Sequence, residues 1–145
     1  HMFGIPDPLY TPEYHVQGDE VAVLITSKGT IRVRLDGEGA PIHVANFCEL
    51  ASSGFYDDLK FHRYVPGFVI QGGCPNTRDM TPEEVASGRP GHDGMPGTGG
   101  PGYRIKHMLD DGYTVFGTTL EGLDVIGKLR AGDVIESIRI EHVAL

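Results

Sequence analysis

Glycine supplies 21 of the 145 residues and separates short segments that are rich in β-branched residues. Because glycine weakens helix interiors and permits tight turns, this distribution favours short strands over long helices. The pattern is clearest around Gly29. Residues 21–26 form a β-rich run, and residues 30–35 alternate with Ile31, Val33 and Leu35 on one face. This alternation predicts a hairpin with one buried face and one solvated face.

The remaining elements follow from similar local patterns. Pro41 at a first-turn position, apolar spacing of three and four, and a closing Gly54 predict a helix between them. A strand is predicted over about residues 60–70, followed by a long Gly- and Pro-rich loop over 74–102 with a helical turn at 81–85. Strands at 103–106, 113–117 and 134–143 and a short helix at 122–130 complete the chain. We therefore predict an all-β fold with two short helices, arranged as a closed or nearly closed antiparallel barrel.

Length and charge narrow the class of protein. A chain of this length builds one domain with a single core, which we assign to residues 19–145. Residues 1–18 carry little periodicity and are expected to form an extended arm that begins with a tag remnant, His1-Met2. The formal net charge of −8 argues against nucleic-acid binding. No apolar run approaches the ~18 residues of a membrane span, so no membrane partner is expected.

The two cysteines, Cys48 and Cys74, form no close motif. Cys48 falls on the apolar face of the predicted helix, where a small buried hydrophobe is expected rather than half of a disulfide. The amino terminus shows no signal-peptide pattern, although the possibility that an export signal was removed stays open. We therefore expect a cytoplasmic location.

The strongest functional signal is the segment FHRYVPGFVIQGG at residues 61–73. It contains no nucleophile and no metal-binding cluster, but a cation, an amide and an apolar wall can hold a peptide and turn it about a proline bond. Strand alternation would place apolar Phe61 and charged Arg63 on one face. Such a conflict is typical of a functional groove. The alternative is an arginine on the wet face of an edge strand, paired with an acidic residue.

Other motifs are weaker. Residues 97–102 match G-x-G-x-x-G, but a loop precedes them, a strand-like segment follows, and Pro101 lacks a backbone donor, so a simple glycine loop is favoured over a dinucleotide site. The seven histidines lack metal-site spacing, and no metal site is predicted. A nucleophilic pair of Cys74 and His62 is conceivable, but no third orienting group accompanies it.

The 61–73 segment resembles the signature of the cyclophilins, which are peptidyl-prolyl cis-trans isomerases. The resemblance extends to residues 40–47, 54–57, 97–103, 109–117 and 121–126, and it covers the chain from about residue 19. It implies that Arg63 is the catalytic residue and that no cofactor is needed. It also implies substrate-binding roles, with Gln71 bonding the peptide backbone, for His62, Phe68, Val69, Gln71, Leu109 and Tyr113.

One departure from the family is large. Cyclophilins carry a further stretch of a few tens of residues before the strand at 115–117, and here Lys106 and His107 run almost directly into Met108. Two barrel strands therefore have no counterpart, so the barrel is expected to be shortened or opened. Three outcomes stay open: the flanking strands pair with each other across residues 108–112, they pair with a second copy, or the natural protein contains a segment that this sequence omits.

The resemblance implies acceleration of rotation about X-Pro bonds in peptides and unfolded proteins. The alternative is a catalytically weak module that binds proline peptides, because the missing strands would supply the pocket floor. Weak cyclosporin binding is also expected, since Met108 stands where sensitive members carry tryptophan and this chain has no tryptophan.

Overall fold

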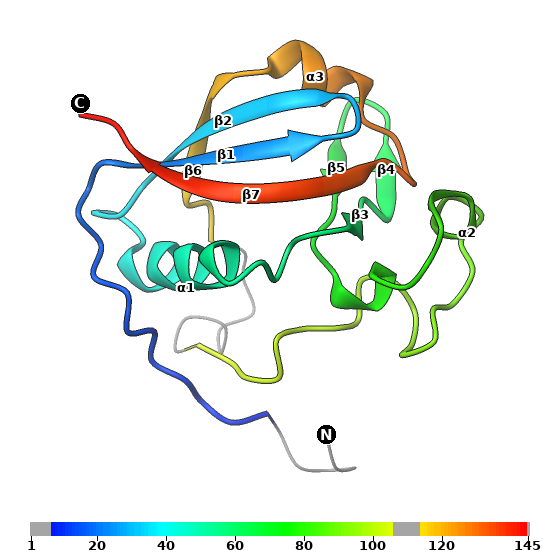
Figure 1. Ribbon diagram of the computed structural model, residues 1–145, viewed down its shortest axis with the longest axis horizontal. Helices are drawn as coiled ribbons and strands as arrows, with labels where there is room; N and C mark the ends of the chain where they lie inside the picture. The colour runs from blue at the N-terminus through cyan, green and yellow to red at the C-terminus, as the bar shows by residue number, and fades with distance from the viewer. Residues whose placement is uncertain (1–6, 106–113, 145) are drawn as a thin grey trace.

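The computed structural model describes residues 7–105 and 114–144. Five strands form one antiparallel sheet in the order β3-β7-β1-β2-β6, and two more form a separate hairpin, β4-β5. In Figure 1 the five-stranded sheet runs between α3 and α1. The elements in chain order are β1 Glu20–Thr26, β2 Gly29–Leu35, α1 Pro41–Ser52, β3 Leu59–Lys60, β4 Arg63–Val65, β5 Val69–Gln71, a 3₁₀ turn at Pro75–Thr77, α2 Pro82–Ala86, β6 Gly117–Glu121, α3 Leu123–Lys128 and β7 Val134–His142.

The predicted hairpin around Gly29 is confirmed. β1 and β2 pair antiparallel, with Leu24 opposite Ile31. Gly29 adopts a φ of +138°, and a Cβ there would lie 2.9 Å from a methyl carbon of Val125 in α3, so a side chain is excluded at this turn. β7 pairs along the other side of β1, which places β1 at the centre of the sheet.

The core lies on one face of this sheet and is closed by α1. Pro41 stands in the first turn of α1, as predicted, and Gly54 follows the helix with a φ of +79°. The helix buries Val44, Cys48 and Ala51 against the sheet residues of the same core cluster. Apolar spacing in the sequence was therefore sufficient to identify both the helix and its buried face.

Among the described residues the sheet is not closed, so a barrel is not confirmed, although the sequence did lead us to expect a barrel that is shortened or opened. β3 and β6 stand at its two ends, and β4-β5 forms a separate sheet. Three α-helices occur within residues 7–105 and 114–144, rather than two. The additional helix is α2, at the anticipated helical turn, where Thr81 and Glu84 form a reciprocal capping box.

The single strand predicted for residues 60–70 divides into β3, β4 and β5. Phe61 and His62 lie outside these strands, so the alternation does not continue from Lys60 to Arg63. Phe61 is buried in the core while Arg63 is exposed, and the prediction that they share a face was wrong. Pro66-Gly67 then reverses the chain, with Gly67 at a φ of +70°.

The two late strands also differ from the prediction. Within residues 103–105, only Arg104 takes part in a β-bridge, and its partner is Leu9 of the arm. The strand predicted for residues 113–117 begins at Gly117 and continues to Glu121. The described parts of these two segments do not pair with each other, and Lys106 to Tyr113 lie outside the described residues.

The arm runs along α1, and one carboxylate of that helix bonds it at three points. Glu49 accepts hydrogen bonds from the Tyr10 hydroxyl at 3.0 Å and from the backbone N–H groups of Glu13 and Tyr14. The Tyr10 ring packs against Tyr103 with centroids 4.6 Å apart. Figure 1 shows the arm passing below α1, away from β4 and β5.

Candidate functional site

The candidate site is built on the β4-β5 hairpin. Arg63 in β4 lies directly opposite Gln71 in β5, and Arg63 Nη1 donates a hydrogen bond to Gln71 Oε1 at 2.9 Å. The turn between the strands is closed by the N–H of Phe68, which donates to the carbonyl of Val65 at 3.0 Å. A guanidinium and an amide are thereby fixed side by side on one face of the hairpin.

An exposed aromatic ring stands at the hairpin turn. The Phe68 side chain is 73% exposed, although a large apolar side chain is normally at least partly covered. Val69 follows it as the first residue of β5 and is half-buried. The structure thus places five of the predicted residues on or beside one hairpin, namely His62, Arg63, Phe68, Val69 and Gln71. Leu109 and Tyr113 lie outside the described residues.

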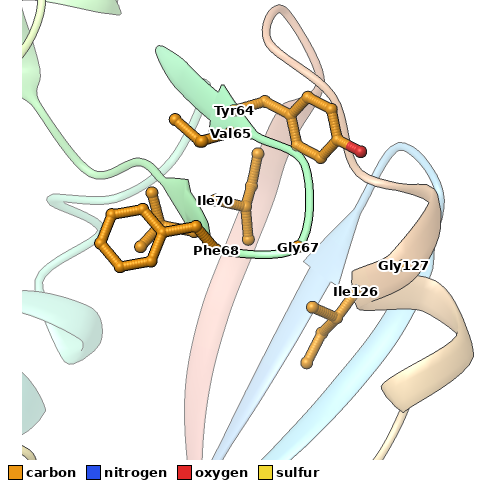
Figure 2. Close-up of a pocket in the computed structure, with 8 residues that line it drawn as sticks. Tyr64, Val65, Gly67, Phe68, Ile70, Ile126 and Gly127 are labelled. Atoms are coloured by element: carbon orange, nitrogen blue, oxygen red, sulfur yellow. The ribbon is translucent and has the colours of Figure 1, made fainter.

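A cavity of about 340 Å³ opens between this hairpin and α3. Phe68 and Val69 line it, but Arg63 and Gln71 do not. Figure 2 shows Ile70 of β5 and Ile126 of α3 on its two sides, with the Phe68 ring on the far side of the turn from Ile126. The cavity therefore lies on the α3 side of the hairpin, and the polar pair of Arg63 and Gln71 does not border it.

Sequence reasoning missed the α3 side of this cavity. Tyr64 and Ile70 could have been found from strand alternation, because they face away from Arg63 and Gln71. Ile126 could not, because nothing local in the sequence brings α3 to the hairpin. The Arg130 guanidinium lies over the Tyr64 ring, 4.4 Å from its centroid, and links the segment after α3 to the same face.

His62 precedes the arginine strand and is packed against the glycine loop. Its Nε2 atom lies 3.0 Å from the position that a Cβ on Gly97 would occupy, and Gly97 has a φ of +95°, so both the close approach and the backbone favour glycine there. Within the described residues, His62 Nδ1 is buried without a hydrogen-bond partner. Burial, and then the nearby Arg63 charge, lower the pKa of His62 below its usual value. The imidazole is consequently held neutral near pH 7.

The glycine loop is tied down by Asn76. Asn76 Nδ2 donates to the carbonyl of Met95 and to the hydroxyl of Thr98, at 3.0 and 3.1 Å. No helix follows residues 97–102 before the described segment ends at residue 105, so the arrangement of a dinucleotide site is not present there. Cys74 Sγ accepts the N–H of Gly99 at 3.3 Å, which gives this thiol a structural role in the loop.

Asp19, Glu20 and His142 form a polar cluster that the sequence spacing did not suggest. Burial raises the pKa of Glu20, but hydrogen bonds from the Gln17 N–H, the Tyr14 hydroxyl and the Gly18 N–H outweigh it, and the net pKa is lowered. His142 Nδ1 lies 2.7 Å from Asp19 Oδ1. These contacts within the protein account for the cluster, which stabilises the start of β1.

Comparison with solved structures identifies the fold. The chain is similar to a cyclophilin-type peptidyl-prolyl cis-trans isomerase from Cryptosporidium parvum, crystallised in the presence of the dipeptide Ala-Pro. The TM-score is 0.57 at 21% identity, covering 83% of this chain and 98% of that one. A cyclophilin from Hirschia baltica gives a TM-score of 0.57 at 22% identity, covering 85% and 74%. The fold is therefore cyclophilin-like, with an open sheet.

Sequence comparison identifies the family. The family model described as cyclophilin type peptidyl-prolyl cis-trans isomerase/CLD matches residues 21–96. Peptidyl-prolyl cis-trans isomerases from Helicobacter pylori and Synechococcus elongatus are 34% and 40% identical, over 91% and 82% of this chain and 95% and 94% of their own lengths. Peptidyl-prolyl cis-trans isomerase B of Bacillus subtilis is 36% identical over 81% of this chain and 95% of its own. The chain belongs to the cyclophilin family.

The alignment with the Helicobacter pylori relative also bears on the missing stretch. It spans 175 positions, which is more than the 145 residues of this chain. That relative therefore contains residues without a counterpart here, as expected from the large departure seen in the sequence.

Proposed function

We propose that this chain accelerates cis-trans rotation about X-Pro bonds and that Arg63 is the catalytic residue. The observation that carries the proposal is the pairing of Arg63 with Gln71 beside the exposed Phe68 ring, on a hairpin that lies within the matched family segment. The relatives at 34–40% identity bear the name of this activity, and no comparison favours the weak-binding alternative.

The chemistry needs only a cation and contacts that hold the peptide. Rotation about a peptide bond is opposed by roughly 18–20 kcal/mol, because the nitrogen lone pair is shared with the carbonyl group. In the twisted state the lone pair is localised on nitrogen, where it can accept a hydrogen bond from the Arg63 guanidinium. An interaction that strengthens only in this state lowers the barrier. The mechanism requires no covalent intermediate and no cofactor.

The other predicted residues receive supporting roles in this proposal. Gln71 exchanges its bond with Arg63 for a bond to the substrate backbone, while Phe68 and Val69 contact the proline ring. His62 supports the arginine strand as a neutral group. Leu109 and Tyr113 stay predictions from the family resemblance. Substrates are proline-containing peptides and unfolded proteins, and the two buried, unpaired cysteines support a cytoplasmic location. No helix within the described residues is long and apolar enough to cross a bilayer.

Turnover of an Ala-Pro peptide tests the role of Arg63. Replacing it with alanine removes the charged donor to the twisted nitrogen, and we expect kcat/KM to fall by about a hundredfold. Arg89→Ala is the matched control, because Arg89 is an exposed arginine outside the hairpin. Circular dichroism should show that both variants keep the native fold. Full activity in a folded Arg63→Ala protein would remove Arg63 from the mechanism, whereas inactive wild-type protein would favour the binding module.

Cyclosporin binding provides a second measurement. The tryptophan that sensitive members offer to the drug is replaced by Met108, so we expect weak affinity. Isothermal titration calorimetry measures it directly, and a nanomolar Kd would show that the missing indole donor is not required.

A further inference from the structure

Asn76 holds one turn of the glycine loop at both of its ends. The turn consists of residues 95–98, and it is closed by the N–H of Thr98, which donates to the carbonyl of Met95 at 3.2 Å. Gly97 has a φ of +95° and follows a proline, which is the sequence that type II turns favour. Asn76 Nδ2 donates to the Met95 carbonyl at 3.0 Å and to the Thr98 hydroxyl at 3.1 Å. One side chain therefore bonds the first and the last residue of the turn.

An amide suits this position for a simple chemical reason. A carbonyl oxygen can only accept hydrogen bonds, so the atom that faces Met95 must be a donor, and Nδ2 carries two N–H groups for its two acceptors. The loop also approaches Asn76 closely elsewhere. A Cβ on Gly99 would lie 2.5 Å from Asn76 Oδ1, and a Cβ on Gly91 would lie 2.5 Å from the Asn76 carbonyl oxygen. The loop is therefore built around Asn76.

The turn that Asn76 holds is in contact with His62. Gly97 lies between the two bonded residues, and a Cβ added to it would stand 3.0 Å from His62 Nε2. The half-buried imidazole therefore has this turn as one of its walls. Because the wall is fixed on both sides of Gly97 by the same amide, loss of that amide would free the turn and open space beside the ring.

The next residue, Thr77, fixes the chain just before His62. Its hydroxyl is fully buried, accepts the N–H of Lys60 at 2.9 Å and donates to the carbonyl of Cys74 at 2.8 Å. Two successive residues of the 3₁₀ turn thus act on the segment that enters β4. Thr77 holds its backbone at Lys60, and Asn76 acts through the loop on the ring of His62.

His62 is connected in turn to both members of the polar pair. Its N–H donates to the carbonyl of Gln71 at 2.8 Å, and Arg63 follows it directly in the chain. A displacement of His62 therefore disturbs the start of β4 and the backbone of β5 together. The Asn76 side chain bonds the loop and does not bond Arg63 or Gln71, so any effect on that pair passes through His62.

From these contacts we propose that Asn76 is a positioning residue of the candidate site. It holds the 95–98 turn against His62 and thereby keeps the imidazole, and the Arg63–Gln71 pair beside it, in the orientation that the reaction uses. The proposal rests on the function proposed for Arg63, and it adds a residue that takes no part in contacting the peptide.

Asn76→Leu tests the proposal, because leucine keeps the branched shape of the side chain and removes both donors. With an Ala-Pro peptide we expect kcat/KM to fall about tenfold, mainly through kcat, since a small displacement in a site weakens contacts to the transition state. Thr98→Val removes one of the two acceptors and should lower kcat/KM by a smaller factor. Gln17→Leu is the matched control, because it makes the same change from amide to leucine at an exposed position of the arm.

Nuclear magnetic resonance follows the His62 ring directly. Its imidazole resonances, assigned by comparison with His62→Asn, should move in Asn76→Leu and stay in place in Gln17→Leu. The N–H of Gly99, which bonds Cys74 Sγ, should exchange about tenfold faster or more in Asn76→Leu. Faster exchange at Gly99 with unchanged His62 resonances and unchanged kcat would show that Asn76 only braces the loop, and would overturn the proposal.

The two readouts also separate this proposal from the function on which it rests. Wild-type protein without turnover would contradict the function proposed for Arg63, while a shift of the His62 resonances would still show that Asn76 positions this ring. Should Asn76→Leu not fold, Thr98→Val gives the same readouts from an exposed position. A folded Thr98→Val protein with wild-type kcat and wild-type His62 resonances would then overturn the proposal.

Discussion

At the scale of the residue, the candidate site depends on two side chains that are eight positions apart and directly opposite in the hairpin. Arg63 and Gln71 satisfy each other in the free protein, with a hydrogen bond of 2.9 Å. In the proposed mechanism, substrate binding therefore replaces the contact that Gln71 already makes. This keeps the guanidinium oriented before a peptide arrives, which lowers the entropy that would otherwise be lost on ordering a long side chain.

His62 should make the stability of the protein depend on pH. Burial and the Arg63 charge lower its pKa in the folded state below the ordinary value of 6.5. The unfolded chain therefore binds this proton at a higher pH, and the free energy of unfolding should fall as the pH drops below about 6.5. In His62→Asn we expect this slope between pH 6.5 and 5 to decrease, by at most about 1.4 kcal/mol per pH unit. Urea denaturation at several pH values measures it.

His142 supplies a control with the opposite sign. Its hydrogen bond with Asp19 raises the pKa of the imidazole, so its contribution is present below pH 6.5 and is lost as the pH rises through the raised value. His142→Asn should therefore alter the slope above pH 6.5 and leave the acid side unchanged. An acid slope that is the same in wild type and His62→Asn would show that the buried Nδ1 is satisfied in solution.

At the scale of the element, one acceptor with three donors fixes the arm to α1, and the backbone bridge of Leu9 with Arg104 holds it further toward the amino terminus. Glu49 bonds Tyr10, Glu13 and Tyr14, so Glu49→Ala removes all three contacts together. Hydrogen bonds to charged groups contribute about 1.5–3 kcal/mol each when buried and less when exposed, so we expect a net loss of about 1–3 kcal/mol from the free energy of unfolding. Chymotrypsin cleavage after Tyr10 should accelerate severalfold.

Glu38→Ala is the matched control for the arm, because Glu38 is an exposed carboxylate of the loop between β2 and α1. It should leave both cleavage and stability unchanged. Equal cleavage rates in Glu49→Ala and wild type would mean that the contacts of Tyr10 with residues 103 and 104, rather than the carboxylate, hold the arm.

Elements that depend on contacts between residues close in the sequence were predicted correctly, and elements that depend on distant contacts were not. The β1-β2 hairpin, α1 and β7 were predicted because their periodicity reports a local choice between one buried face and one wet face. The segment at 60–70 was misjudged, because Pro66-Gly67 reverses the chain and ends the alternation on which the prediction relied. The contact of Leu9 with Arg104 joins residues far apart in the sequence, and no local pattern signals it.

At the scale of the whole molecule, both the cyclophilin-like topology and the expectation of a shortened or opened barrel came from the family resemblance. Composition and spacing alone could not decide which strands stand at the ends of the sheet, because that depends on pairing between residues distant in sequence. The candidate site followed the same division. Arg63, Phe68 and Gln71 were found in one motif, whereas the cavity wall contributed by Ile126 required the folded chain.

The separate β4-β5 hairpin has a consequence for how the protein loses activity. The hairpin forms its own two-stranded sheet, and although Ile70 packs against the core, a cavity separates part of the hairpin from α3. Segments with few buried contacts open at a lower free energy than the global core, so the site should melt as a subglobal unit. We expect isomerase activity to disappear at a urea concentration below the midpoint reported by far-UV circular dichroism of the main sheet. Coincident midpoints would instead show that the hairpin and the sheet unfold as one cooperative body.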